Sequence, residues 1–352
     1  MQVEAILYYF ILFIIVSTLI PFIRSDYWIF RVFEYPRLQK LVINVVLIIL
    51  VFVFFFPSST WQYVVAGALV INLIYLAYLI YPFTRLAKVQ IVDAIHPTGP
   101  DNIKILIANV YQENRRAAEY KQLISTYDPD VVLMVETNDW WHQQIDAIKK
   151  DYPHQITVPL ENTYGMLLYS RLKLSDGSVN FLVEEGIPSI EVNVTLGSGQ
   201  MVKLFCLHPT PPVPQENPRS TERDKEILLV GAKAKKCKCP VIVIGDLNDV
   251  AWSYTNELFG KVSGLLDPRR GRGFYNSFNA KYFFLRFPLD HIFCSSDFTL
   301  SELKRLKSCG SDHFPMFVNL QYHSEAEKYN EEPKATSEDR ELANEKINAP
   351  TD

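Results

Sequence analysis

Hydrophobic residues dominate the first quarter of the chain, where they form three long stretches. These run from Glu4 to Ile23, from Leu41 to Phe56 and from Trp61 to Phe83. A helix needs about 20 apolar residues to cross the hydrocarbon core of a bilayer. The first and third stretches reach that length, and the second reaches it if Lys40 or Pro57 lies at the interface. The pattern therefore predicts three transmembrane helices.

The basic residues around these stretches predict the orientation in the membrane. A cleaved signal peptide is the alternative for the first stretch, but no basic segment precedes it and two more apolar stretches follow. Cytoplasmic loops carry an excess of Lys and Arg. Such residues follow the first stretch (Arg24, Arg31, Arg37 and Lys40) and the third (Arg85 and Lys88). We expect an integral, multi-pass protein of the plasma (inner) membrane with everything after Phe83 in the cytoplasm, and the opposite orientation stays open.

Between residues 89 and 322 the pattern changes to short apolar runs separated by polar segments. Helices are predicted over residues 115–127 and 220–236, where apolar residues recur at helical spacing. Strands are predicted over residues 102–110, 130–136, 164–170, 189–196, 201–208, 241–246, 289–296 and 314–320. Many short strands joined by hairpins and a few helices indicate a layered α/β (α+β) domain.

The last segment, residues 323–352, is acidic and has few aromatic residues. Such a composition buries too little apolar surface to fold alone, so the segment is predicted to be a disordered acidic tail. The expected organisation is a three-helix membrane anchor (1–88), one folded domain (89–322) and this tail.

Charge and cysteine content give no support to two broad interpretations, a strongly basic nucleic-acid-binding protein and a disulfide or zinc scaffold. The formal net charge is −4, so no overall positive field favours nucleic acid. The five cysteines are an odd number without the partner spacing of a zinc site. They are expected to pack as small apolar residues, not to form a disulfide framework.

Polar side chains recur at the ends of the predicted strands. The sequence VIVIGDLNDV, for example, ends a buried run in Asp246 and Asn248. Each such residue taken singly is a common turn residue. Together, the strand ends carry Asn109, Glu136, His208, Asp246, Asn248, Asp290, Asp312 and His313. A sheet whose strand ends converge would assemble them into one acidic pocket that also contains histidine.

The residue types in this set suit one kind of chemistry. Carboxylate and amide oxygens without thiols are ligands for Mg²⁺ or Mn²⁺. Histidines oriented by carboxylates supply an acid or a base near neutral pH. A metal, an oriented histidine and amide donors are together suited to the hydrolysis of a phosphate ester.

The same residues carry a family resemblance. The ordered segments IANV, VVLMVE, YGMLLYSR, CLHPTPP, VIVIGDLND, FPLDHIF and GSDHFP resemble the endonuclease/exonuclease/phosphatase (DNase I-like) superfamily from Ile103 to Leu320. The resemblance implies a four-layer sandwich, in which two packed mixed β-sheets are flanked by helices and the site lies at one edge. Three transmembrane helices would precede this sandwich.

The resemblance also implies roles for individual residues. Glu136 matches the metal-binding glutamate, with Asn109 and Asp312 near the metal. His208 matches the position that steadies the scissile phosphate or protonates the leaving group.

The remaining matches concern the attacking water. Asp246 and Asn248 match the pair that orients the water and holds a phosphate oxygen. Asp290 and His313 resemble an Asp–His dyad in which the imidazole serves as the base.

Other polar residues have less specific interpretations. Arg269, Arg270 and Arg272 lie in a glycine-bearing loop that could bind the substrate, and a solvated loop is the alternative. Arg223 is expected to be an exposed helix arginine, and Ser311 a turn residue. His291 is expected on the opposite strand face from Asp290 and is not assigned to the site.

The sequence thus predicts a membrane-anchored phosphoesterase that depends on Mg²⁺ or Mn²⁺ and acts through an activated water. Nucleic acid and lipid phosphates both remain open as substrates, as do nuclease and phosphatase activity. The alternative is a catalytically silent, membrane-anchored binding module that retains the fold. Beyond the substrate and the lipid bilayer, the sequence indicates no partner.

Overall fold

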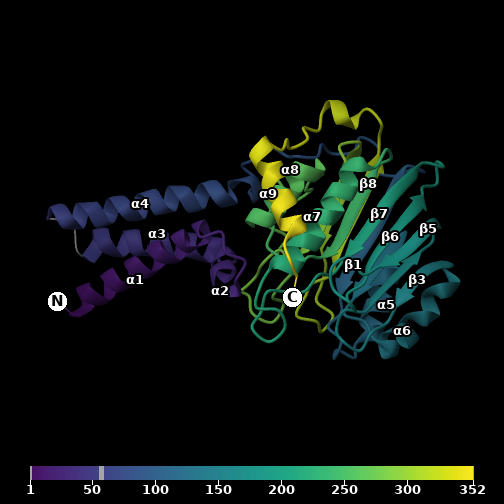
Figure 1. Ribbon diagram of the computed structural model, residues 1–352, viewed down its shortest axis with the longest axis horizontal. Coiled ribbons are helices and arrows are strands. Elements are labelled where there is room, and N and C mark those ends of the chain that lie inside the picture. The colour runs from purple at the N-terminus through teal and green to yellow at the C-terminus, as the bar shows by residue number, and fades with distance from the viewer. Residues whose placement is uncertain (1, 55–58, 352) are drawn as a thin grey trace.

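The computed structural model of the protein describes residues 2–54 and 59–351, so Pro57 and Ser58 of the expected turn lie outside the described residues. Three long helices extend side by side from the folded domain: α1 (Gln2–Leu19), α3 (Arg37–Phe54) and α4 (Thr60–Ile80) (Figure 1). Glu4–Phe22 and Thr60–Phe83 are each long and apolar enough to cross a membrane. A third span exists if the pair Trp28–Glu34 and Arg37–Val53, which bends by 65°, counts as one.

The long helices pack together through an apolar seam and present apolar side chains outward. Ile14, Leu47 and Leu69 are buried between them, whereas Phe13, Val53 and Ile71 are exposed. Polar contacts reinforce the seam. Asn72 Nδ2 donates to Asn44 Oδ1 at 2.9 Å, and Lys40 Nζ donates to the Ser17 carbonyl at 2.5 Å. Apolar outer faces with polar groups turned inward are typical of membrane helices.

The folded domain contains two mixed sheets. The first has the order β10-β11-β1-β2-β4-β3 and the second the order β5-β6-β7-β8-β9. Within them, β1 pairs with β2 and β7 with β8 in parallel, and the other neighbours are antiparallel. The strands are β1 (Asn102–Asn109), β2 (Val131–Val135), β3 (His154–Val158), β4 (Met166–Ser170), β5 (Lys173–Asn180), β6 (Ser189–Thr195), β7 (Met201–Leu207), β8 (Val241–Asp246), β9 (Asp290–Cys294), β10 (Phe298–Arg305) and β11 (Met316–Tyr322).

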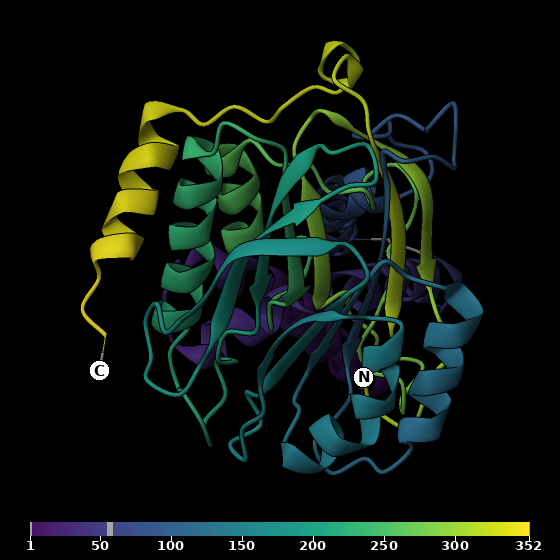
Figure 2. The same ribbon diagram turned by 90° about the vertical axis from the view of Figure 1, so that its right-hand side faces the viewer.

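Helices cover the outer face of each sheet and complete four layers (Figure 2). The sheets pack on each other through buried aliphatic residues such as Ile105, Leu133 and Ile244. Helices α5 (Ala117–Tyr127) and α6 (Asp139–Ile145) cover the first sheet, and α7 (Thr221–Lys236), α8 (Tyr254–Ser263) and α9 (Ser337–Asn348) cover the second. Short helical turns are α2 (Trp28–Arg31), η1 (Ile20–Phe22), η2 (Val32–Glu34), η3 (Tyr81–Phe83), η4 (Asp146–Lys150) and η5 (Ala326–Lys328). The predicted four-layer fold is confirmed.

The tail differs from the prediction of disorder. Residues 337–348 form α9, which begins with a capping box between Thr336 and Asp339. Ala343 of this helix is buried, and Leu342 and Ile347 pack against the same core as α7 and α8. The prediction was wrong because it judged the segment by its own composition, whereas a few apolar side chains suffice once a neighbouring core is available.

The segment after α1 docks on the domain through buried charge. Arg31 is buried and donates to Thr255 Oγ1 at 2.8 Å, and its guanidinium lies 3.5 Å from the Asp224 carboxylate. Lys346 of α9 reaches both Asp224 and Asp26 at 2.9 Å. Burial opposes the ionisation of Asp224, but Lys346, Arg31 and Arg223 outweigh it and hold the pKa of this carboxyl well below its usual range.

We predict that Arg31→Ala lowers the free energy of unfolding by roughly 3–5 kcal/mol, because it breaks a buried ion pair and leaves Asp224 less compensated. The measurement is thermal or denaturant unfolding of the detergent-solubilised full-length protein. Lys328→Ala, which removes only an exposed pair with Glu325, is the control and should cost less than about 1 kcal/mol. Equal losses in the two variants would contradict the docking role of Arg31.

Candidate active site

The two sheets bring the ends of four strands to one edge of the sandwich. Asn109 ends β1, and Glu136 follows the parallel neighbour β2. In the second sheet Asp246 ends β8 and lies opposite Asp290, the first residue of the antiparallel strand β9. The register therefore places four polar side chains from different parts of the chain near one another.

Backbone geometry at this edge differs from ordinary strand geometry. Glu136 (φ 56°) and Asn248 (φ 51°) both lie in the left-handed region directly after their strands. Gly245 has φ 145°, and a Cβ there would lie 1.9 Å from the Leu207 carbonyl oxygen. Non-glycine residues in the left-handed region are strained and cluster at functional sites. This strained backbone geometry turns Glu136 and Asn248 toward the edge of the sandwich.

The Asn109 amide joins the two sheets. Its Nδ2 donates to Glu136 Oε1 at 2.6 Å and to Asp246 Oδ2 at 3.0 Å. Its Oδ1 accepts from the Tyr111 backbone N–H at 3.0 Å, which fixes the orientation of the amide. One buried side chain thus sets the separation of two carboxylates that belong to different sheets.

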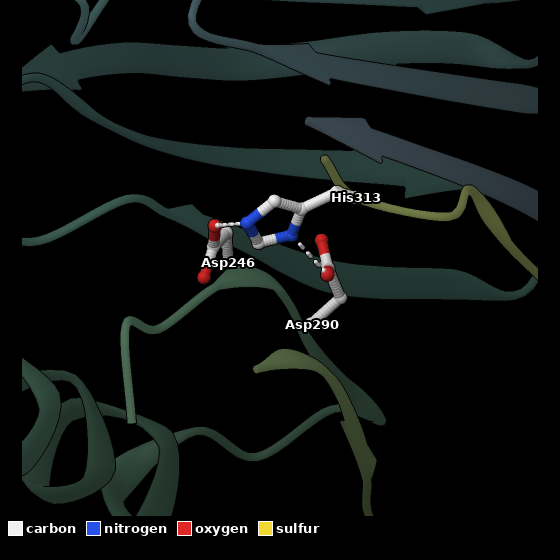
Figure 3. A group of neighbouring side chains, drawn as sticks. All are labelled: Asp246, Asp290 and His313. Carbon is white, nitrogen blue, oxygen red and sulfur yellow. Dashed lines mark hydrogen bonds and ion pairs between the residues drawn. The ribbon is translucent and has the colours of Figure 1, made fainter. Parts of the chain in front are cut away.

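His313 lies between two buried carboxylates (Figure 3). Its Nδ1 is 2.8 Å from Asp290 Oδ2, and its Nε2 is 3.5 Å from Asp246 Oδ2. The position of the ring is further fixed because the backbone N–H of His313 donates to Ser311 Oγ at 3.0 Å. Ser311 is therefore a turn residue, as expected, and one that orients the histidine.

Burial and neighbouring charge shift the pKa values of this cluster. Burial lowers the pKa of His313, but Asp246 and Asp290 outweigh it and raise that pKa to about 10. Burial raises the pKa of Glu136 to about 7, with Asn109 and His313 opposing and Asp246 and Asp312 adding to the rise. Burial likewise raises the pKa of Asp246, although His313 opposes the shift. The site therefore holds protons more tightly than the same groups would in water.

His208 and Asn248 complete the rim. His208 follows β7, and its ring lies 5.3 Å from the ring of Tyr164. Burial lowers the pKa of His208 to about 4, despite the nearby Asp246. Asn248 is half-buried. Its backbone N–H donates to Asp246 Oδ1 at 2.9 Å, and its Nδ2 donates to the Pro209 carbonyl at 2.9 Å.

The donor set fits a divalent cation. Asp246, Asp290 and His313 offer ligand atoms that lie within 4.8 Å of one another. Glu136 and Asp312 are half-buried and add carboxylates at the rim. Asp290 Oδ1 and His208 Nδ1 are buried without a hydrogen-bond partner in the described chain, as expected where a ligand supplies the partner. Oxygen donors of this kind suit a hard metal ion.

Comparison with known sequences matches the part of the chain that contains these site residues. The sequence profile of the Endonuclease/Exonuclease/phosphatase family matches residues 106–313, which include the whole cluster. The chain belongs to this family. No curated protein sequence matches it at a significant level.

Solved structures with the family fold share little sequence with the chain. A humanized D. rerio TDP2 is 20% identical, with a TM-score of 0.53 over 63% of this chain and 99% of that one. D. rerio TDP2 complexed with a single-strand DNA product is also 20% identical, with a TM-score of 0.53 over 62% and 99%. A Bacteroides thetaiotaomicron family protein is 19% identical, with a TM-score of 0.51 over 64% and 99%. The three structures support the fold.

The structure gathers most of the residues expected at the site of this family member. Direct contacts connect Asn109, Glu136, Asp246, Asn248, Asp290 and His313. Asp312 precedes His313 in the same loop, and its charge raises the pKa values of Glu136 and His313. His208 likewise contributes to the pKa of Asp246, which it lowers.

The three loop arginines do not join this cluster. Arg269 is buried, pairs with Asp267 at 2.7 Å and contacts His291 Nδ1 at 2.7 Å. Arg272 binds Asp93 at 2.5 Å, and the Arg270 guanidinium lies 5.3 Å from the Phe83 ring. The expectation of substrate binding was wrong for Arg269 and Arg272, since their donors are used within the protein. Arg270 lies against Phe83 of η3, away from the cluster.

Sequence reasoning missed buried residues that support the site. Arg223 is buried, not exposed as expected, and donates to the Asn248 carbonyl at 2.8 Å and to Asp224 at 2.9 Å. His291 is buried and contacts the Asp249 carbonyl at 2.8 Å. No local pattern in the sequence marked Arg223 as buried, because neighbouring residues on a helix point in different directions and its other partner, the Asn248 carbonyl, is distant in the chain.

We predict that His208→Gln changes how stability depends on pH. The pKa of His208 is about 4 in the folded protein, whereas an unfolded histidine has about 6.5. The folded state therefore binds fewer protons between these values, and wild-type stability is lost as the pH falls from about 6.5 toward 4. Relative to the variant, the wild type should lose about 2 kcal/mol between pH 8 and pH 5.

The measurement is denaturant unfolding of the full-length protein in detergent with EDTA at the two pH values. His323→Gln, at an exposed position, is the control and should follow the wild type. A stability difference between His208→Gln and wild type that does not change with pH would contradict a buried, neutral His208.

Proposed function

We propose that this protein is a membrane-anchored, divalent-metal-dependent phosphoesterase that hydrolyses its substrate with an activated water. The observation that carries the proposal is the placement of His313 between Asp290 and Asp246, next to Glu136 and Asn109. Membership of the family supports the reaction class. The apolar helices support the anchor, and the oxygen-rich donor set supports the metal.

Each residue has a proposed role. Glu136, with Asn109 and Asp312 beside it, would hold Mg²⁺ or Mn²⁺. That cation would offset charge on the phosphoryl oxygens. His208 and Asn248 would bind the phosphate from the rim.

The geometry favours Asp246 as the proton acceptor. Both nitrogens of His313 face carboxylates, and only the imidazolium form can donate from both. We therefore assign Asp246 the removal of a proton from water, and His313, as the imidazolium between Asp290 and Asp246, the positioning and charge balance of that carboxylate. The resemblance instead implied that His313 is the base.

A catalytically silent binding module is the second candidate. It predicts gaps in the polar set, but every matched position holds a residue able to perform the chemistry. For the substrate, the D. rerio TDP2 structure with a single-strand DNA product makes nucleic acid one class. The apolar helices make lipid phosphates the other.

We predict hydrolysis of bis-p-nitrophenyl phosphate by the full-length protein with Mg²⁺ or Mn²⁺, and its loss with EDTA. Glu136→Gln and Asp246→Asn should each lower kcat/KM by about 10²-fold or more, because metal binding and water activation are both required. Glu119→Gln, at a half-exposed position of α5 outside the cluster, is the control and should retain activity. Full activity in Asp246→Asn would reject the assigned role, and an inactive wild type would favour the binding module.

We also predict that the catalytic domain lies in the cytoplasm, since basic residues cluster after the first and third apolar stretches. A green-fluorescent-protein fusion at the C-terminus should fluoresce in bacterial cells, and an alkaline-phosphatase fusion at the same point should be inactive. The reverse result would place the domain on the opposite side.

A further inference from the structure

A hairpin between β8 and β9 exposes a compact set of large apolar side chains. We call Phe278–Phe287 the aromatic hairpin. Its arms are joined by Phe278 N–H donating to the Phe287 carbonyl at 2.9 Å and Asn279 N–H donating to the Leu285 carbonyl at 3.1 Å. The exposed fractions at its tip are 55% for Tyr282, 78% for Phe283, 56% for Phe284 and 43% for Leu285. Lys281 and Arg286 flank this tip.

The base of the aromatic hairpin belongs to the catalytic edge. The Phe278 ring lies 5.0 Å from the His313 ring. The Ala280 N–H donates to the Asp312 carbonyl at 2.6 Å, and Ser277 Oγ accepts from the Asp290 N–H at 2.9 Å. The hairpin therefore has a fixed position relative to the histidine and both aspartates.

The two flanking cations lie over rings of the folded domain, Lys281 Nζ at 4.8 Å from Tyr111 and the Arg286 guanidinium at 5.0 Å from Phe314. Further contacts of the aromatic hairpin are with the N-terminal helical segment. The Phe287 ring lies 5.6 Å from the ring of Tyr35, which follows η2. Gln39 Nε2, in the first turn of α3, donates to the Phe284 carbonyl at 3.0 Å. The next turn of α3 already exposes Val42 and Ile43, as expected of a surface that faces lipid. The hairpin tip thus lies level with the end of a membrane helix.

We propose that the tip of the aromatic hairpin inserts into the interfacial region of the bilayer, so that the catalytic edge faces the lipid surface and the substrate is a phosphate ester carried by a membrane lipid. This substrate assignment rests on the proposed phosphoesterase function. Aromatic rings flanked by Lys and Arg suit the interface, where the rings lie among the acyl chains and the charges reach the head groups. In the proposed membrane anchor, α3 would hold the bilayer beside the tip.

Single-stranded nucleic acid is the competing occupant, because exposed aromatic rings also stack on bases. The negative charge beside His208 disfavours the binding of single-stranded nucleic acid. Tyr164, which packs on the His208 ring, lines a hollow of about 430 Å³ together with Glu184, Glu185 and Glu216. A polynucleotide continuing past the scissile phosphate on this side would meet these carboxylates, whereas a lipid head group presents its charge at one point.

Insertion of the tip can be measured without catalysis. The full-length protein, with Cys237 and Cys239 changed to Ser, would carry Phe283→Cys labelled with an environment-sensitive fluorophore. It would be reconstituted in phosphatidylcholine and phosphatidylglycerol vesicles that contain spin-labelled lipid. The matched control is Met201→Cys, which is 43% exposed and begins β7 at the end opposite His208.

The label at position 283 should be quenched at least about threefold more strongly than the label at position 201. Equal, weak quenching at the two positions would overturn insertion of the tip. This result does not depend on whether the protein is an enzyme.

The substrate class is tested with the double variant Phe283→Ser/Phe284→Ser. Wild-type protein should hydrolyse phosphatidic acid or a polyisoprenyl phosphate in vesicles, and the double variant should do so at least about tenfold more slowly. Both should hydrolyse soluble bis-p-nitrophenyl phosphate at rates within about twofold. Cleavage of a single-stranded oligonucleotide with no action on either lipid would overturn the lipid assignment alone, whereas an inactive wild type on every substrate would overturn the phosphoesterase function.

Discussion

The hydrogen bonds of Asn109 join carboxylates that come from different sheets, and the site depends on this contact. Asn109 ends β1 in the first sheet, and Asp246 ends β8 in the second. Aliphatic residues between the sheets bring these strand ends together, and the amide then sets their separation. His313 adds a second connection, because its ring spans Asp246 and Asp290. The packing of the two sheets therefore also determines the geometry of the site.

The N-terminal helical segment, the proposed membrane anchor, is part of this arrangement. The Asn248 carbonyl accepts hydrogen bonds from Tyr35, in the segment after the first span, and from Arg223, each at 2.8 Å. Trp252, in the loop after β8, donates to the Glu34 carbonyl at 2.9 Å. The loop that follows Asp246 is thus held from one side by α7 and from the other by the segment between α1 and α3. Movement of the anchor relative to the domain would change the position of Asn248.

Sequence patterns revealed those features that are local in the chain. Strands such as Val241–Asp246 are continuous apolar runs, and the polar residues that follow them pointed to the site. Strand β5, whose burial is mostly partial, and α9, whose apolar residues are few, lack a strong pattern and were missed. The environment of Arg269 could not be inferred either, because its partner His291 is brought to it only by the tertiary fold, although Asp267 is a neighbour in the chain.

The position of Lys346 has a consequence for the order of assembly during biosynthesis. This residue pairs with Asp26, from the segment that follows the first span, and with Asp224 on α7. Domains are generally made from the N-terminus, so the apolar helices leave the ribosome long before α9 does. Until then Asp26 and Asp224 lack one of their cations, and the joint between anchor and domain stays incomplete. The nascent chain would therefore acquire its final rigidity at this joint in the last step of translation.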